Sequence, residues 1–164
     1  MQKIRQAIQA ESESIIHLLK ECAKWIKEKE INQWQYLLEG GEDGEIRDAI
    51  ERGETYILLH ENEIRGTFTI SDCQNEWDEH IFGPDIENNS LYIHRLAIHP
   101  ALIGQRMGPI LLEWIQKTFN QEKEWLKLDC VASNMKLVTF YCDNGFEHIG
   151  ETDGHMKFRK RFGK

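Results

Sequence analysis

The sequence predicts a mixed α/β fold, in which a central mixed sheet of about six to seven strands is flanked by about four helices. Three observations predict it. Short stretches of alternating apolar and polar residues have the period of half-buried strands. Other stretches place apolar residues three and four positions apart, which gives a helix one buried face. Finally, hairpins and strand–helix–strand crossovers are mixed along the chain, unlike the regular alternation of a doubly wound nucleotide-binding fold.

The first half of the chain is predicted to hold a weak first strand, two helices and a strand hairpin. These elements span 4–7, 12–29, 45–52, 55–60 and 64–71. Ser12 or Ser14 can cap the longer helix, and Gly53 ends the shorter one. The acidic and irregular segment 72–89 is expected to be a long loop, and such loops are usually functional or mobile.

The second half is predicted to hold two strand–helix units and a closing hairpin. These elements span 91–99, 110–120, 125–132, 134–144, 146–151 and 155–162. Pro100 ends the first of these strands, because proline has no N–H to donate to a sheet, and Pro109 suits the first turn of the helix that follows. Asn134 can cap the next helix, and Gly145 fits the left-handed position that ends it.

The composition bounds the class of protein. At 164 residues the chain is predicted to be one domain, 1–164, with a sizeable core. The formal net charge of −8 argues against nucleic acid as a partner. The sequence shows no signal peptide and no stretch long enough to cross a membrane, so a cytoplasmic location and no membrane partner are expected. The four cysteines are scattered, so neither a metal site nor a disulfide framework is expected.

The segment between the strand 91–99 and the helix 110–120 has the features of an anion site. It contains Gly104, Arg106 and Gly108. A glycine-bearing loop before a helix aims unpaired N–H groups and the positive end of the helix dipole at one point, which suits a phosphate. Arg106 can add a cation that forks onto phosphate oxygens. The alternative interpretation is a tight strand-to-helix connection with an exposed arginine.

Three segments, taken in order and with their spacing, resemble the GNAT superfamily of N-acetyltransferases. Arg95-Leu96-Ala97-Ile98-His99-Pro100 looks like the central strand of that family, and Ile103 to Gly108 lies where its pyrophosphate loop falls. Asn134 through Phe140-Tyr141-Cys142-Asp143-Asn144-Gly145-Phe146 resembles the helix with the Phe-Tyr and Gly-Phe signature. The loop departs from the family pattern, because Ile103 stands where Arg or Gln is usual and Arg106 stands where Gly is usual.

The resemblance implies that the chain transfers an acetyl group from acetyl-CoA, used as a co-substrate, to a primary amine. Main-chain groups of the central strand would bind the pantetheine arm, and the loop with the helix start would bind the pyrophosphate. A non-glycine residue at Arg106 is expected to resist a positive φ. The residues expected to contact the coenzyme are Leu96, Ala97, Ile98, Ile103, Gly104, Gln105, Arg106, Met107, Gly108 and Asn134.

Two catalytic residues are expected from the same resemblance. Tyr141 holds the family position of the acid that protonates the departing thiolate, and the alternative is a core tyrosine on a packed helix. His94 is the best candidate for the base, since the amine must attack in its neutral form. A lone strand histidine is more often structural. Rival bases lie on the predicted loop 72–89, at Glu76, Asp78, Glu79 and His80.

The predicted function is therefore a small-molecule N-acetyltransferase in which the amine attacks the thioester directly. Two alternatives stay open: an acyl-CoA-binding sensor without turnover, and an acetyltransferase acting on a protein N-terminus or lysine. The acidic segment 72–87 favours cationic acceptors. A homodimer also stays open, and no metal is expected.

Overall fold

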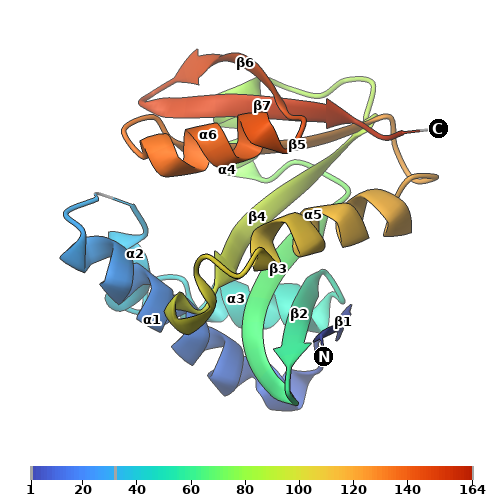
Figure 1. The fold of residues 1–164 in the computed structure, drawn as a ribbon. Helices are drawn as coiled ribbons and strands as arrows, with labels where there is room; N and C mark the ends of the chain where they lie inside the picture. The colour runs from blue at the N-terminus through green and yellow to red at the C-terminus, as the bar shows by residue number, and fades with distance from the viewer. Residues whose placement is uncertain (1, 32, 164) are drawn as a thin grey trace. The chain divides into compact units, whose positions relative to one another are not determined.

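The computed structural model describes residues 2–31 and 33–163, and its contacts divide the chain into two compact units (Figure 1). Unit 1 comprises Met1–Ile70 and Arg95–Leu111, and unit 2 comprises Ser71–His94 and Leu112–Lys164. The strands hydrogen-bond in the order β1-β2-β3-β4-β5-β7-β6. Strand β4 (Ser90–Ile98) gives its first five residues to unit 2 and its last four to unit 1. The predicted fold class is confirmed, with seven strands in the described residues. The single domain stays a prediction.

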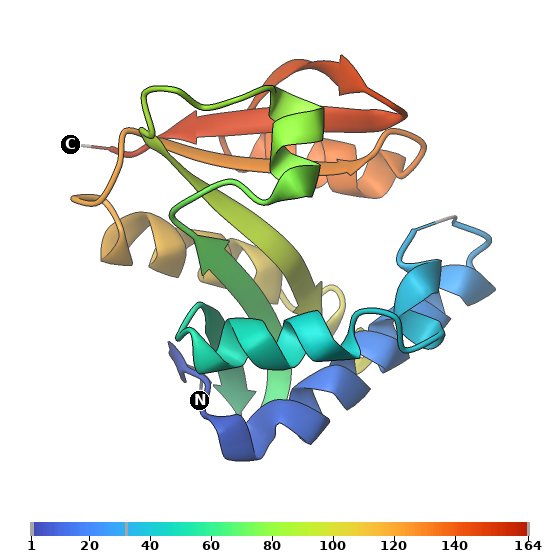
Figure 2. The ribbon, with the colours of Figure 1, turned by 180° about the vertical axis from the view of Figure 1, so that it is seen from behind.

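Unit 1 is a three-stranded antiparallel meander continued by the end of β4. The strands of the meander are β1 (Gln2–Gln6), β2 (Thr55–His60) and β3 (Glu63–Ser71). The helical elements beside them are η1 (Gln9–Glu11), α1 (Ser12–Glu28), α2 (Gln35–Leu38), α3 (Asp43–Glu51) and η2 (Pro100–Leu102). Helices α1 and α3 lie against the same face of β2 and β3 (Figure 2). Their apolar stripes form the core of this unit with β2, through Ile15, Leu19, Ile46, Ile50 and Ile57.

Unit 2 is built on the start of β4 and on β5 (Trp125–Val131), β6 (Glu147–Thr152) and β7 (His155–Arg161). Helices α4 (Glu76–Phe82) and α6 (Met135–Asp143) lie on opposite faces of the β5–β7 sheet (Figures 1 and 2). The β6–β7 hairpin turns at Asp153 and Gly154, whose φ angles are 51° and 79°. Positive φ at both central residues matches the right-handed strand twist, so the predicted turn is confirmed.

Helix α5 (Met107–Thr118) begins in unit 1 and ends in unit 2. Its apolar residues Leu111, Leu112 and Ile115 are buried, as their spacing predicted. The helix starts two residues before Pro109, so this proline occupies the third helical position. Proline is still tolerated there, because the N–H groups of the first turn have no acceptor inside the helix.

Two local predictions are wrong. The segment 72–89 is not one irregular loop, because it contains α4, which is capped by Asn75. Ser12 and Ser14 do not cap α1: the cap position is Glu11, and the Ser12 hydroxyl instead donates to the Gln9 carbonyl at 2.8 Å. No helix in the described residues combines the length and the apolar character needed to span a bilayer.

Candidate active site

Strand β4 changes its backbone conformation at Arg95, between the predicted base His94 and the predicted coenzyme contacts Leu96 to Ile98. Arg95 has a φ of 50°, which is rare for a residue with a side chain. Parallel pairing of β4 with β5 is confined to Ser90, Leu91 and Tyr92. A left-handed residue inside a strand interrupts the hydrogen-bond ladder and turns the neighbouring side chains, as at a β-bulge. The β4 backbone around His94 and Leu96 is therefore irregular where a main-chain-binding substrate arm would need free groups.

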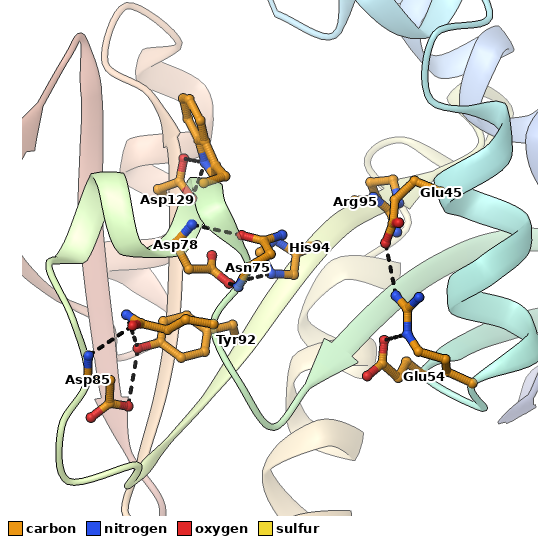
Figure 3. Close-up of polar contacts among 12 residues, drawn as sticks. Glu45, Glu54, Asn75, Asp78, Asp85, Tyr92, His94, Arg95 and Asp129 are labelled. Carbon is orange, nitrogen blue, oxygen red and sulfur yellow. Dashed lines mark hydrogen bonds and ion pairs between the residues drawn. The ribbon is translucent and has the colours of Figure 1, made fainter.

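The half-buried His94 pairs with the buried Asp78 of α4 in unit 2 (Figure 3). The distance from His94 Nε2 to Asp78 Oδ2 is 3.1 Å, and the two side chains are 14% and 1% exposed. Asp78 Oδ2 also accepts a hydrogen bond from the Asn75 N–H at 3.2 Å, while the Asn75 side chain accepts from the Asp78 N–H at 2.8 Å. This reciprocal capping box fixes the first turn of α4 and with it the position of the carboxylate.

The pair determines which nitrogen of His94 can act as a base. An ionised carboxylate can only accept hydrogen bonds, so Nε2 of His94 must carry the proton that points at Asp78. The lone pair on Nδ1 is then the one that can accept a proton. A carboxylate in this position orients the imidazole ring and would stabilise its protonated form.

A second carboxylate, Asp129 of β5, lies in the same unit. The Trp77 indole N–H donates to its two oxygens at 3.3 and 3.2 Å, and His155 Nδ1 lies 3.0 Å from Oδ2. The Trp77 and His155 rings meet edge to face, with centroids 4.8 Å apart. Burial raises the pKa of Asp129, and the nearby negative charge of Asp78 adds to this effect. Two carboxylates therefore lie within electrostatic range of His94.

Tyr141 lies inside unit 2 on α6, with 5% of its surface exposed. Its ring packs against Phe140, Phe146 and Phe158, with centroids 5.2 to 5.7 Å apart. Burial raises the pKa of the Tyr141 phenol above its usual value, so the hydroxyl is protonated at neutral pH. Among the described residues none hydrogen-bonds this hydroxyl, although buried tyrosine hydroxyls usually have a partner.

The predicted pyrophosphate loop lies in unit 1, between η2 and the start of α5. The φ angles of Gly104 and Arg106 are 87° and 62°, so Arg106 adopts the left-handed conformation it was expected to resist. Gln105 and Arg106 are exposed, as is Ile103 at 51%, whereas Met107 is buried. The loop turns through hydrogen bonds from the Ile103 N–H to Pro100 and from the Gln105 N–H to Leu102.

The other predicted coenzyme contacts divide between the two units. Leu96, Ala97 and Ile98 end β4 in unit 1, with Ala97 buried and its neighbours half-buried. Asn134 begins α6 in unit 2, and its side chain accepts from the Leu137 N–H at 3.4 Å, which confirms the predicted cap. Its contact with coenzyme stays a prediction.

From the sequence, Asp78 was expected only as a rival base on a loop, and Trp77, Asp129 and His155 were not expected to lie near it. A signal for Asp78 was present: Asn75 followed three residues later by Asp78 is a capping-box pattern. No local signal joins Asp129 to Trp77, because that contact depends on where α4 packs. Within the described residues no cluster of His, Cys, Asp and Glu suits a metal ion.

Comparison with known proteins identifies the family and the fold. Residues 13–146 match the model of the acetyltransferase (GNAT) family. The chain is 33% identical over 156 residues to the uncharacterised N-acetyltransferase YesJ of Bacillus subtilis (strain 168), covering 94% of this chain and 87% of that one. A GNAT-family acetyltransferase from Listeria monocytogenes superposes with a TM-score of 0.83 at 25% identity, covering 98% and 94% of the two chains.

The PaiA N-acetyltransferase of Thermoplasma acidophilum, solved in complex with coenzyme A, has the same fold. It superposes with a TM-score of 0.81 at 16% identity and covers 99% of each chain. The family match over most of the chain and the identity to YesJ over nearly its full length are decisive. The chain therefore belongs to the GNAT family of acetyltransferases.

Proposed function

We propose that the chain transfers an acetyl group from acetyl-CoA to a primary amine of a small cationic molecule, with His94 as base and Tyr141 as acid. The observation that carries this proposal is the His94–Asp78 pair, at 3.1 Å. A domain that only senses acyl-CoA has no need of an oriented base beside a buried carboxylate. The pair therefore favours turnover over the sensor alternative.

The reaction begins with removal of a proton from the acceptor. The ammonium of the acceptor gives a proton to Nδ1 of His94, and the imidazolium is stabilised by Asp78. The neutral amine attacks the thioester carbonyl, and the C–N bond forms as the carbonyl becomes an oxyanion. Backbone N–H groups of β4 would stabilise this oxyanion. When the C–S bond breaks, Tyr141 protonates the departing thiolate, since its raised pKa keeps the proton on the phenol until then. The nitrogen loses its second proton as the neutral amide forms, and this proton restores the phenol of Tyr141 through solvent.

Coenzyme binding is assigned to the loop 103–108 and the first turn of α5. The N–H groups of a helix start have no acceptor within the helix, and they point at one place together with the positive dipole end. Gly104 has nothing within 4 Å of the position where a Cβ would lie, so its surroundings are open to a ligand. The exposed Arg106 can supply the cation that the usual side chain at Ile103 would have provided.

A cationic acceptor is favoured by the charge of unit 2. Asp78 is buried and the side chain of Asp129 is 9% exposed, and Trp77 and His155 both contact Asp129. Carboxylates attract an ammonium group through charge, and the exposed Trp77 indole beside them offers a ring face that can attract the same cation. We therefore infer a diamine-like or aminoglycoside-like acceptor rather than a neutral aromatic amine.

The test is an amine panel assayed with the wild-type chain and acetyl-CoA, with release of free thiol and the mass of the product as readouts. The proposal predicts steady release of thiol with aliphatic diamines or aminoglycosides, and addition of one acetyl group to the amine. If acetyl-CoA stabilises the chain but no amine releases thiol, the sensor alternative is correct. If only peptides accept the acetyl group, the small-molecule acceptor is wrong.

A further inference from the structure

Helix α1 is linked directly to the segment that leads into the coenzyme loop. Glu21 Oε2 lies 2.7 Å from His99 Nε2, and the neighbouring Cys22 thiol donates to the Ile98 carbonyl at 3.3 Å. All four residues belong to unit 1. Two successive residues of α1 therefore hold two successive residues at the end of β4.

The ring of His99 is used at both nitrogens, and this fixes its tautomer. Nδ1 accepts a hydrogen bond from the Ala101 N–H at 3.0 Å. An N–H can only donate, so Nδ1 carries no proton and the neutral ring must carry its proton on Nε2. Nε2 then donates to Glu21. The imidazole therefore hydrogen-bonds both the Glu21 carboxylate of α1 and the Ala101 backbone of η2.

The other oxygen of Glu21 has a separate partner. His17 Nε2, one helical turn away on α1, lies 2.5 Å from Glu21 Oε1. The carboxylate thus lies between two imidazoles, of which only that of His99 contacts the chain that enters the loop. His17 is 75% exposed, and its contact with Glu21 lies on α1 and away from the loop, which makes it a matched control for the contact between Glu21 and His99.

The geometry of η2 determines where the coenzyme loop starts. The Leu102 N–H donates to the His99 carbonyl at 2.9 Å, and the next two turns are closed by the Ile103 and Gln105 N–H groups. These turns follow one another directly along the chain, and the first of them contains Ala101, whose N–H is bound by His99. A change in the orientation of the Ala101 peptide therefore shifts the backbone N–H groups that follow, including that of Gly104.

We infer that His99 and Glu21 are positioning residues for coenzyme binding: α1 holds the loop 103–108 in its phosphate-binding geometry through the Glu21–His99–Ala101 hydrogen bonds. This inference rests on the proposed assignment of the loop to the coenzyme. It predicts an effect limited to ligands that carry the pyrophosphate, because these hydrogen bonds act on the loop and on neither catalytic side chain.

The experiment compares coenzyme A with S-acetylpantetheine, which has the same arm without the nucleotide. Dissociation constants are measured by calorimetry and kinetic constants with the best acceptor amine. His99→Ala and Glu21→Ala should each raise the Kd for coenzyme A and the KM for acetyl-CoA about three- to tenfold, the usual range for one hydrogen bond to a charged group that is not fully buried. The kcat value and the KM for S-acetylpantetheine should stay near wild type.

Three further variants separate positioning from a general loss of structure. Glu21→Gln keeps an acceptor for His99 and should restore most of the affinity, as should His99→Asn, which keeps an acceptor for the Ala101 N–H. His17→Ala removes the other imidazole and should change nothing. The double variant His99→Ala/Glu21→Ala should lose no more affinity for coenzyme A than either single variant, because both residues act through the same hydrogen bond.

Two results would overturn the inference while leaving the proposed function intact. In the first, wild type and His99→Ala bind coenzyme A equally. In the second, the KM for S-acetylpantetheine rises as much as the KM for acetyl-CoA in both alanine variants, which would show a general structural role. Failure of the wild-type chain to bind coenzyme A at all is a separate outcome, and it would overturn the proposed function together with this inference.

Discussion

Two residues, Arg106 and Asp78, adopt arrangements that cost folding free energy. Arg106 adopts a left-handed backbone at φ 62°, a conformation that costs a residue with a Cβ about 1–2 kcal/mol. Asp78 is fully buried, and its Oδ1 has no hydrogen-bond partner among the described residues. A buried polar atom without a partner is unusual in a folded protein. Both residues belong to the segments assigned here to coenzyme binding and proton transfer, where such costs are typical.

The strain at Arg106 can be measured by substitution. Arg106→Ala keeps the left-handed backbone and removes the guanidinium, whereas Arg106→Gly also relieves the backbone. We expect the glycine variant to be more stable than the alanine variant by roughly 0.5–1 kcal/mol, since the relief is partly offset by the greater chain entropy of unfolded glycine. Urea unfolding of the ligand-free chains measures the difference. Equal stability of the two variants would show that the loop relaxes to an unstrained conformation.

Tyr141→Phe tests the acid with the smallest possible change. The ring and its packing against Phe146 and Phe158 stay, and only the hydroxyl is lost. General acid catalysis usually contributes about 10²–10⁴-fold, and we expect the low end because a thiolate leaves readily unaided. The kcat should fall while the Kd for coenzyme A stays unchanged. A variant with wild-type kcat, under conditions where chemistry limits turnover, would show that solvent supplies the proton.

At the scale of elements, α4 carries Asp78, which contacts the proposed base His94. The helix was not predicted, because its sequence of acidic residues resembles a solvated loop and its apolar face is short. The ends of β2, β5 and α1 were predicted to within one residue, because their apolar residues recur with a regular period. The left-handed Arg95 had no sequence signal, since arginine has no preference for that conformation.

The cap of α4 should therefore affect catalysis as well as stability. Asn75→Ala removes the acceptor for the Asp78 N–H, and loss of an N-cap usually costs about 0.5–2 kcal/mol. Because this turn carries Asp78, we expect the kcat to fall severalfold while the KM for acetyl-CoA is unchanged. Asn75→Ser keeps a capping oxygen and should recover both properties. If the alanine variant loses stability but keeps its full kcat, the cap does not position the carboxylate.

At the scale of the whole molecule, the buried charge of Asp129 links stability to pH. Burial raises the pKa of this carboxyl in the folded state, so folding favours its protonated form. Its contribution is most favourable below the unfolded pKa of about 3.9 and is lost as the pH rises through the folded pKa. Asp129→Asn keeps an acceptor for Trp77 and removes the charge, so the variant should gain stability over wild type as the pH rises from 4 to 8. Chemical denaturation across about this range measures it. A difference that is independent of pH would contradict the assignment.

The fold class could be predicted because it depends on local pattern, and the residues proposed for the site were named from short segments of the sequence. The loop 103–108 is marked by its glycines before a helix, and His94 and Tyr141 were expected from the resemblance of their segments to a known family. The partners of these residues could not be predicted, because they come from distant segments: Asp78 reaches His94 from α4, and Glu21 reaches His99 from α1. Only packing brings such residues together, and hydrophobic pattern alone does not specify it.

The most direct test of the central claim, that the His94–Asp78 pair activates the amine, is the single-turnover rate of acetyl transfer in His94→Ala with and without added imidazole. The account predicts a loss of roughly 10²–10⁴-fold in this rate, unchanged affinity for coenzyme A, and partial recovery when imidazole enters the space left by the side chain. His80→Ala, which removes an exposed histidine of α4, serves as the control and should behave as wild type. A His94→Ala chain that transfers the acetyl group at the wild-type single-turnover rate would contradict the account.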